Sequence, residues 1–251
     1  MSERLRYEIQ DGIARIVMDD GKLNVMSPAM LQDIAGAFDR AAAEGVPALL
    51  TSGRPGIFSA GFDLKVLAAN DPEASLAMVR AGADLALQIL CHPLPVVAAI
   101  AGHAYPMGAF LTLASDIRIG GAGPYRIGLN EVAIGIPAPG FALELARQRL
   151  TPAALNRTAV TGSMFGFDEA VAAGFLDELV PEAELPARAD AVTRALAGIH
   201  LPSHAVVKHR LRQGAVDAIR AAIDTELTLD AYRRRAAEGP SAVRLPNAPA
   251  A

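Results

Sequence analysis

The sequence predicts a mixed α/β fold, with stacked strand-and-helix turns in the first part of the chain and mostly helices in the second. Over roughly the first 120 residues, short apolar runs rich in β-branched residues alternate with segments whose apolar residues recur every three or four positions. Loops rich in glycine, serine and proline, such as Ser52 to Gly61, separate these segments. From Phe141 onward the apolar residues keep a mostly helical spacing.

The chain opens with a predicted β-hairpin followed by a helix. Leu5 to Gln10 and Ile13 to Met18 are β-rich runs, and Asp11-Gly12 between them favours a two-residue hairpin turn. Ser27-Pro28 then combines an N-cap residue with a proline at the first helical position. Apolar residues at helical spacing follow, and Gly45 ends the predicted helix.

Further strands, loops and helices follow in irregular alternation. The helix before His92-Pro93-Leu94-Pro95 must stop there, because proline cannot continue it. Val96 to Ile100 is apolar at every position, which is typical of a strand buried on both faces. The predicted elements in order are a strand over Val46–Thr51, a loop over Ser52–Gly61, a helix over Pro72–Leu90, a strand over Val96–Ile100, a loop over Ala101–Gly108, a short buried helix over Ala109–Ala114 and a strand over Asp116–Gly120.

The rest of the chain is predicted to be helical up to a proline-containing tail. The last helical stretch contains Gly214, where we expect a break, since glycine weakens a helix interior. The tail after Gly239 holds three prolines and almost no apolar periodicity, so we expect it to be disordered or to act only as a strap. The predicted helices cover Phe141–Arg149, Pro152–Thr161, Asp168–Ala173, Ala187–Ala197 and Ala205–Arg235.

Composition excludes several classes of protein. The chain has 251 residues, a formal net charge of -4 and 52% apolar residues. These values describe a globular protein large enough to fold without disulfides or a structural metal. Its single cysteine, Cys91, cannot form an intramolecular disulfide, and no apolar run reaches the length of a membrane span. Acidic and basic residues are mixed, which argues against nucleic-acid or membrane partners. With no leader at the start, we expect a cytoplasmic protein.

Three short stretches could carry chemistry. The small-residue loop Ile57 to Lys65 and the turn Gly102 to Phe110 each lie between a strand and a helix, where backbone N–H groups can face an anion or a carbonyl oxygen. In the second turn, Pro106 occupies the first helical position, which leaves the N–H groups of Met107 and Gly108 free at the helix end. Each stretch is also compatible with an ordinary strand-to-helix connection.

The third stretch places one carboxylate among apolar residues. Glu131 lies within Gly128 to Gly140, which is otherwise apolar and punctuated by glycine and proline. A carboxylate that is partly desolvated there should have a raised pKa suited to proton abstraction. The alternative is a solvated surface glutamate.

In combination these stretches resemble the enoyl-CoA hydratase/isomerase family, also called the crotonase family. The resemblance runs from about residue 5 to residue 235. Each motif is weak alone, but they are specific in this order. The matching segments are Phe58–Lys65, Pro93–Ala104, Ser115–Ile119, Asn130–Val132 and Ile134-Gly135.

The resemblance implies a fold, an assembly and a division of the chain. The fold would be a crotonase-like spiral of ββα turns with a C-terminal helical region that assembles trimers, often paired into hexamers. Residues 1–190 would form the spiral core with the active site, residues 191–239 the C-terminal helical region, and residues 240–251 the disordered tail.

The resemblance also implies a substrate class and roles for individual residues. Family members bind acyl-CoA thioesters and stabilise an enolate, so no cofactor is expected beyond the coenzyme A of the substrate. The N–H groups of Phe62 and Met107 would form the oxyanion hole, with Gly108 shaping the helix start. Such donors are worth about 3 to 4 kcal/mol each. Ala60, Leu64 and Lys65 match positions that line the CoA site.

Two departures from the family pattern bear on the reaction. Hydratases of the family use two glutamates, and Phe110 stands at the first of these positions while Glu131 matches the second. A single carboxylate is the arrangement expected of double-bond isomerases, since it can take a proton from one carbon and return it to another. Pro137 and Pro139 also remove N–H donors from a loop that is usually glycine-rich near the water site.

The remaining polar residues suggest no other chemistry. We expect His103 to be a packed or capping residue, and a triad built from Ser59 and His103 lacks a nucleophile-elbow pattern. Lys208 lies where family members often place a basic residue near the adenine of a CoA bound to a neighbouring subunit, and it could equally be a solvated surface lysine. No metal site is expected, because the late histidines lack acidic or cysteine partners at ligand spacing. Those histidines are His200, His204 and His209.

Two hypotheses about function follow. The first is an enzyme acting on acyl-CoA thioesters, an enoyl-CoA hydratase or double-bond isomerase of fatty-acid metabolism, with Phe110 favouring isomerisation. The second is a catalytically silent acyl-CoA binding protein that keeps the groove without turnover.

Overall fold

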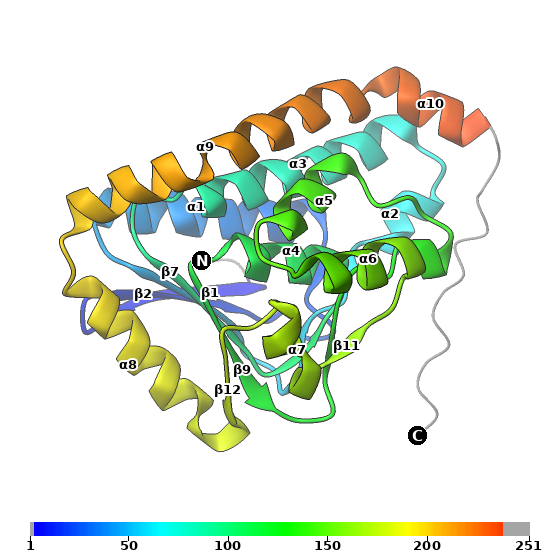
Figure 1. Cartoon of the computed structure of the whole chain (residues 1–251). Coiled ribbons are helices and arrows are strands. Elements are labelled where there is room, and N and C mark those ends of the chain that lie inside the picture. Colours follow the sequence, from blue (N-terminus) through cyan, green and yellow to red (C-terminus); the bar gives the residue numbers. More distant parts are fainter. Residues whose placement is uncertain (1–2, 238–251) are drawn as a thin grey trace.

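A six-stranded sheet forms the centre of the computed structural model, which describes residues 3–237 (Figure 1). All neighbouring strands are parallel except β1 and β2 at one edge. These two form the predicted hairpin, and both turn residues, Asp11 and Gly12, have the positive φ angles that a tight hairpin turn requires. The strand order is β1 (Leu5–Gln10), β2 (Ile13–Met18), β4 (Ala48–Ser52), β7 (Val96–Ile100), β9 (Ile117–Ala122) and β12 (Glu178–Pro181).

Two smaller sheets include strands from segments that were predicted to be loops. The predictions of loops over Ser52–Gly61 and Ala101–Gly108 were therefore wrong in part. Strands of two to four residues are too short to show the alternation that identifies a strand in a sequence. The four-stranded sheet has the order β11 (Phe165–Gly166), β10 (Arg126–Ile127), β8 (Gly102–Ala104) and β5 (Gly56–Ser59), and β3 (Val25–Met26) pairs with β6 (Gly61–Phe62).

The sheets are linked by a repeated path of the chain. After β4 the chain enters β5, after β7 it enters β8, and after β9 it enters β10, so each turn contributes one strand to the large sheet and the next to the small one. Helices follow the strand pairs and complete ββα turns. These helices are α1 (Pro28–Glu44), α2 (Leu64–Ala68), α3 (Pro72–Leu90), α4 (Pro106–Ala114), α5 (Gly140–Arg147), α6 (Pro152–Thr161) and α7 (Phe167–Ala173).

The helix signals predicted at Ser27-Pro28 and Gly45 are observed, and similar capping begins α3 and α6. Ser27, Asp71 and Thr151 accept hydrogen bonds from the first turns of α1, α3 and α6, each with a proline in that turn. Gly45 ends α1 in the left-handed conformation. The helix predicted from Ala109 begins earlier, because Pro106 occupies its first position.

The C-terminal region consists of three helices, and the break predicted at Gly214 was wrong. The helices are α8 (Leu185–Ala197), α9 (Leu201–Glu226) and α10 (Leu229–Ala237). The continuous α9 passes through Gly214, which is exposed. Val216 and Ile219 pack against the main core, which offsets a glycine cost of about 1 kcal/mol. The actual break lies at Leu227 and Thr228.

Both faces of the large sheet are covered. One face joins the main core with α1, α3, α4 and α5, and α8 packs on the other. On that second face Leu49, Val97 and Ile119 meet Leu185 and Ala189 of α8. This explains why the central strands are apolar at successive positions.

A buried ion cluster attaches α9 to the sheet. Asp116 accepts hydrogen bonds from Lys208 Nζ at 2.7 Å and from Arg212 Nη2 at 2.8 Å. Lys208 is buried, so the structure supports neither a solvated side chain nor one that reaches an adenine. Desolvation lowers its pKa to about 8 despite the neighbouring carboxylate.

Two further predictions concern the C-terminal part. The division between residues 190 and 191 falls inside α8 and stays a prediction. The predicted tail, 240–251, lies outside the described residues.

Within the described part of the chain, no helix is both long and apolar enough to cross a membrane.

Candidate active site

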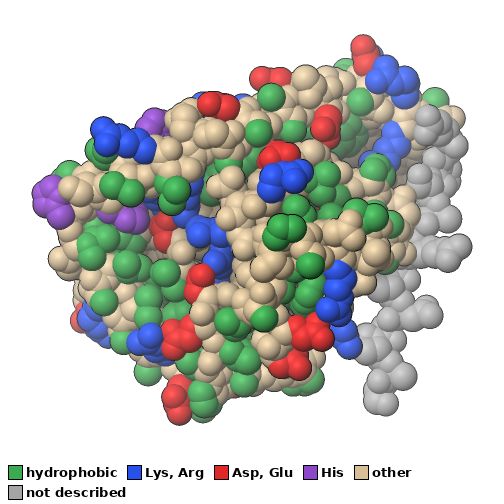
Figure 2. Space-filling view, in the orientation of Figure 1, with side chains coloured by type: hydrophobic (Ala, Val, Ile, Leu, Met, Phe, Trp, Pro, Cys, Tyr) green, Lys and Arg blue, Asp and Glu red, His purple; other side chains and the backbone are tan. Residues whose placement is uncertain are grey.

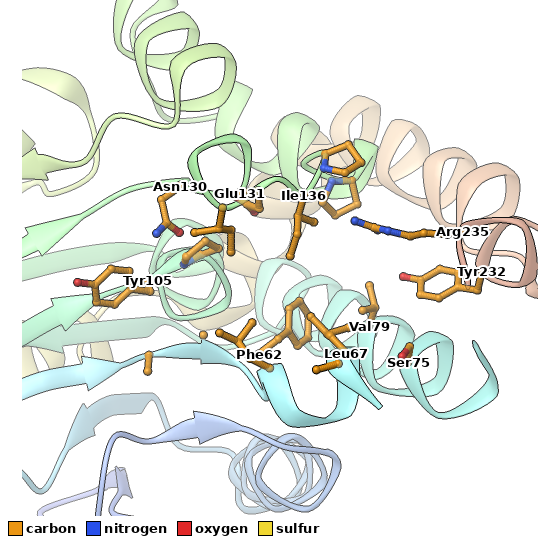
Figure 3. Close-up of a pocket in the computed structure, with 18 of the residues that line it drawn as sticks. Phe62, Leu67, Ser75, Val79, Tyr105, Asn130, Glu131, Ile136, Tyr232 and Arg235 are labelled. Atoms are coloured by element: carbon orange, nitrogen blue, oxygen red, sulfur yellow. The ribbon is translucent and has the colours of Figure 1, made fainter. Parts of the chain in front are cut away.

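An elongated pocket of about 890 Å³ lies between the spiral core and α10 (Figure 3). Its walls come from the segment after β5, from α2, α3 and α4, from the segment Asn130 to Pro139, and from α10. Glu131 and Tyr105 lie toward one end, and Tyr232 and Arg235 toward the other. Apolar side chains, among them Phe62, line the stretch between the two ends.

The Glu131 segment is held from behind by α6. Thr158 Oγ1, fully buried, accepts a hydrogen bond from Leu129 N at 2.8 Å and donates one to Leu129 O at 3.4 Å. The left-handed Gly162 at the end of α6 lies close to Ala133, where any side chain would collide with the backbone. These contacts fix the short 3-10 turn Val132–Ile134 that begins directly after Glu131.

Glu131 is a desolvated carboxylate that faces the pocket. Its residue exposure is 7%, and its Oε2 atom has no hydrogen-bond partner among the described residues. Burial raises the pKa of this carboxyl group from 4.5 to about 7. The sequence-based expectation of a raised pKa is confirmed, whereas the alternative of a solvated surface glutamate is wrong. A carboxylate with this pKa can accept and return a proton near neutral pH.

Two glycines allow the loop after β5 to approach the start of α4. Gly61 has φ +87°, and a Cβ there would lie 3.7 Å from Met107 N. A Cβ on Gly108 would lie only 2.8 Å from Ser59 Cβ, so only glycine permits this contact without a shift. No side chain caps α4, whose first turn contains Met107 and Gly108. The backbone of Phe62 and the start of α4 are thus brought together.

The side chains of Phe62 and Met107 meet at a notch on α3. Gly82 forms this notch: a Cβ there would lie 2.5 Å from Phe62 Cζ and 3.0 Å from Met107 Sδ. Met107 is fully buried, and Phe62 lines the pocket. Gly82 was not identified from the sequence, because an isolated glycine inside a helical pattern carries no specific signal.

The side chain of Phe110 packs against a second aromatic ring. Phe110 is 1% exposed and contacts the ring of Phe141 edge-to-face, with centroids 5.7 Å apart. Pro137 and Pro139 also line the pocket, and Pro139 is the N-cap residue of α5. The acidic residues among the described lining are Glu131 and Asp71, and Asp71 caps α3 by accepting from Ala74 N at 3.0 Å.

The structure brings most, though not all, of the predicted site residues to the pocket. Ala60, Phe62, Leu64, Phe110, Glu131, Pro137 and Pro139 line it. Among the described residues, Met107 and Gly108 lie behind the lining, and the exposed Lys65 lies outside the pocket.

The alternative serine-histidine triad does not form. Ser59 Oγ is fully buried, donates to Asn24 O at 2.7 Å and accepts from Gly61 N at 3.1 Å. His103 Nδ1 accepts from Arg126 N at 3.1 Å, as expected for a packed histidine. Within residues 3–237, no group of three His, Cys, Asp or Glu side chains is placed to hold a metal ion.

Comparison with known proteins identifies the family. A profile of the enoyl-CoA hydratase/isomerase family matches residues 8–239. The chain belongs to this family. Among solved structures, an enoyl-CoA hydratase/isomerase family protein from Pseudomonas syringae is 40% identical with a TM-score of 0.87, covering 90% of this chain and 97% of that one. The predicted crotonase-like fold is thereby confirmed.

Two further relatives of this crotonase-family chain carry the name isomerase. A protein from Mycobacterium tuberculosis is named an enoyl-CoA isomerase in one solved structure and a probable enoyl-CoA hydratase in another. The first of these structures is 41% identical with a TM-score of 0.84, covering 89% of this chain and 97% of that one. The mitochondrial enoyl-CoA delta isomerase 1 of Rattus norvegicus is 32% identical over 170 residues, which is 67% of this chain. The matched region spans only 59% of the rat protein.

Several polar residues in the pocket of this crotonase-family protein were not predicted as site residues from the sequence, among them two from the core and two from α10. Asn130 lies within a motif that carried the resemblance and Tyr105 directly follows another, so their neighbours in sequence could have indicated them. Tyr232 and Arg235 come from α10, about one hundred residues after Glu131. Only the path of α10 across α3 brings them to the pocket.

Proposed function

We propose that this protein is an enzyme of fatty-acid metabolism that moves the double bond of an enoyl-CoA thioester, with Glu131 as its single acid/base. The observation that carries the proposal is one desolvated carboxylate in a largely apolar pocket. Phe110, which the family resemblance matches to the second glutamate of hydratases, lines the same pocket. The names of relatives, which include both enoyl-CoA isomerases and hydratases, support a CoA thioester as substrate.

The reaction that fits one carboxylate is a 1,3-shift of a proton. The ionised Glu131 takes a proton from C2 of a 3-enoyl thioester, and the electron pair of that C–H bond moves into a dienolate whose charge lies on the thioester oxygen. The Glu131 carboxylic acid then returns the proton to C4, which leaves a 2-enoyl thioester and the ionised carboxylate. Atoms and charge balance without water or a redox cofactor.

The dienolate oxygen requires hydrogen-bond donors. We assign this role to the N–H groups of Phe62 and Met107, supported by the close approach of Gly61 to Met107 N and by the uncapped start of α4. Because the donors are backbone groups, the side chains of Phe62 and Met107 can pack against Gly82 without affecting them. Gly108 permits the approach of α4 to Ser59.

Other parts of the assignment concern binding, assembly and location. Ala60 and Leu64 would contact coenzyme A, and Lys65, exposed beside the pocket, would meet its phosphates. No cofactor is proposed beyond the coenzyme A of the substrate, and assembly is proposed as trimers or hexamers. A cytoplasmic location is proposed from the composition, with its single cysteine.

The deciding experiment compares the wild type with Glu131→Gln in deuterated water. With 3-enoyl-CoA, the wild type should give 2-enoyl-CoA with little or no 3-hydroxyacyl product. Glu131→Gln should lose at least about a thousandfold in turnover while it still binds the thioester. Water addition at a useful rate would instead identify a hydratase that tolerates Phe110.

The alternative of a silent acyl-CoA binding protein receives no support from the comparisons, and the same experiment tests it. A silent protein would bind the thioesters tightly, turn over neither isomer, and change little on Glu131→Gln.

A further inference from the structure

The end of the pocket opposite Glu131 carries polar side chains of its own. Tyr232 and Arg235 enter it from α10, and Ser75 of α3 lies near them (Figure 3). Ser75 Oγ already donates to Val66 O at 3.3 Å, whereas an aliphatic acyl chain would offer Tyr232 and Arg235 no polar partner. Their presence therefore bears on which acyl group the pocket accepts.

Arg235 differs from the two arginines that precede it on α10. Arg233 is exposed and pairs with Glu73, with Nη2 and Oε1 2.8 Å apart, and Arg234 is exposed to solvent. Arg235 is partly buried and lines the pocket. The three consecutive arginines thus occupy three different environments. Of the three, Arg235 is the one whose side chain lines the pocket.

No carboxylate of the described chain neutralises Arg235. Among residues 3–237 no acidic group lies within salt-bridge distance of its guanidinium, although Asp71 lines the same pocket and caps α3. Its charge acts on the hydroxyl of Tyr232, whose pKa burial raises to about 12. The hydroxyl is therefore a neutral donor at physiological pH, and it lies beside a guanidinium that has unused donors.

The wall between the two ends suits a hydrocarbon chain. Phe62, Leu67, Val79 and Ile136 line the pocket between Glu131 and the α10 residues. Lys65, the residue assigned to the phosphates of CoA, is exposed and lies outside the pocket. On this assignment the nucleotide lies outside the pocket, and the apolar wall that leads from Glu131 to Arg235 is left for the acyl chain.

We propose that the preferred substrates are acyl-CoA thioesters whose acyl chain ends in a carboxylate, bound by Arg235 and Tyr232 at the far end of the pocket. A guanidinium presents a fork of N–H groups that matches a carboxylate, and the Tyr232 hydroxyl adds a third donor. This inference rests on the proposed function, because that function places the thioester at Glu131.

The test measures binding of freshly prepared saturated esters, which have no double bond for the enzyme to move, to the full chain by calorimetry. Matched pairs have equal carbon numbers: succinyl- and butyryl-CoA, adipyl- and hexanoyl-CoA, suberyl- and octanoyl-CoA, with free CoA as a further ligand. At the chain length that spans the pocket, the wild type should bind the carboxylate-terminated ester at least about tenfold more tightly than its methyl-terminated partner.

Substitutions then test which residues cause the preference for carboxylate-terminated esters. Arg235→Met, which keeps an apolar stem, should weaken the carboxylate-terminated ester by about tenfold or more and change the methyl-terminated ester by less than about twofold. Tyr232→Phe should reduce the same preference by a smaller factor. Arg234→Met is the matched control on the same helix, outside the pocket, and should bind every ligand as the wild type does.

Each outcome decides the matter. Equal binding of the two kinds of ester by the wild type would overturn the inference and leave the proposed function standing. An equal loss for all ligands on Arg235→Met, free CoA included, would mean that Arg235 holds CoA phosphates and would also overturn it. No binding of any CoA ester would contradict the proposed function as well.

Discussion

The ionisation of Glu131 should control the pH dependence of turnover. The group is buried, and its pKa is raised to about 7, so below that pH most molecules carry the protonated acid and lack a base. We predict that kcat/KM for 3-enoyl-CoA falls about tenfold per pH unit below pH 7 and levels off above it. Initial rates between pH 5.5 and 9 check this. A flat profile across that range would rule out Glu131 as the base.

The same pKa makes Glu131 a destabilising residue when it is ionised. Between about pH 4.5 and 7 the folded protein binds the proton more tightly than the unfolded chain does, so stability falls as the pH rises through this window. The shift corresponds to roughly 3 kcal/mol above pH 7. We predict that Glu131→Gln is more stable than the wild type at pH 8 by up to this amount, with a smaller gain at pH 5.

Urea unfolding at the two pH values measures this difference independently of any substrate. An equal effect of Glu131→Gln at both would show that the carboxyl group is not desolvated in the folded protein.

At the scale of elements, two glycines on helices should respond to alanine in opposite ways. On α4, Gly108→Ala would bring Cβ to 2.8 Å from Ser59 Cβ, so α4 must move away from the loop after β5. We predict a loss of about 1 to 3 kcal/mol in unfolding free energy together with a lower kcat. On α9, Gly214→Ala meets no atom within 4 Å and should stabilise by up to about 1 kcal/mol.

Chemical unfolding of both variants, with kcat measured alongside, tests this pair. A Gly108→Ala variant with unchanged kcat would show that the position of α4 does not matter for the oxyanion. Gly214→Ala controls for a general effect of added methyl groups.

Local signals in the sequence predicted the long elements and could not predict the short ones. Pro72–Leu90 was predicted with its observed bounds, because a proline starts it and a cluster of prolines follows it. Strand β10 has only two residues, and it forms because β8 and β11 lie beside it. The break predicted at Gly214 was wrong, since packing of the neighbouring turns of α9 overrides the low helix propensity of glycine.

In the candidate site, too, some residues could be predicted from the sequence and others could not. Glu131, Phe62 and Phe110 lie in motifs that are contiguous in sequence, so they could be named before the structure. Arg235 is one of three adjacent arginines whose sequence gives no reason to single it out. Its place in the pocket depends on the turn at Leu227 and Thr228, after which α10 packs against α3.

At the scale of the whole molecule, Asp116 joins the spiral core to the C-terminal helices. It accepts from Val96 N at the start of β7 as well as from Lys208 and Arg212 on α9. Asp116→Ala would leave two buried cations without a counter-charge, so we predict a loss of about 3 to 5 kcal/mol in unfolding free energy. Lys208→Met, which keeps the pair with Arg212, should lose less, and equal losses in urea unfolding would contradict this account.

The exposed face of α9 carries large hydrophobic side chains that the proposed assembly would cover. Leu211 is 79% exposed and Val207, one turn before it, 60% exposed, and hydrophobic side chains lie along this part of the surface between charged ones (Figure 2). We predict that light scattering will give three or six times the 26.1 kDa of one chain. Leu211→Glu should lower this mass, because burying the added charge in an apolar contact is costly. The matched exposed change Arg210→Glu, next to it, should lower the mass less. A monomeric wild type would contradict the predicted assembly, and Leu211→Glu of unchanged mass would place the contact elsewhere on the surface.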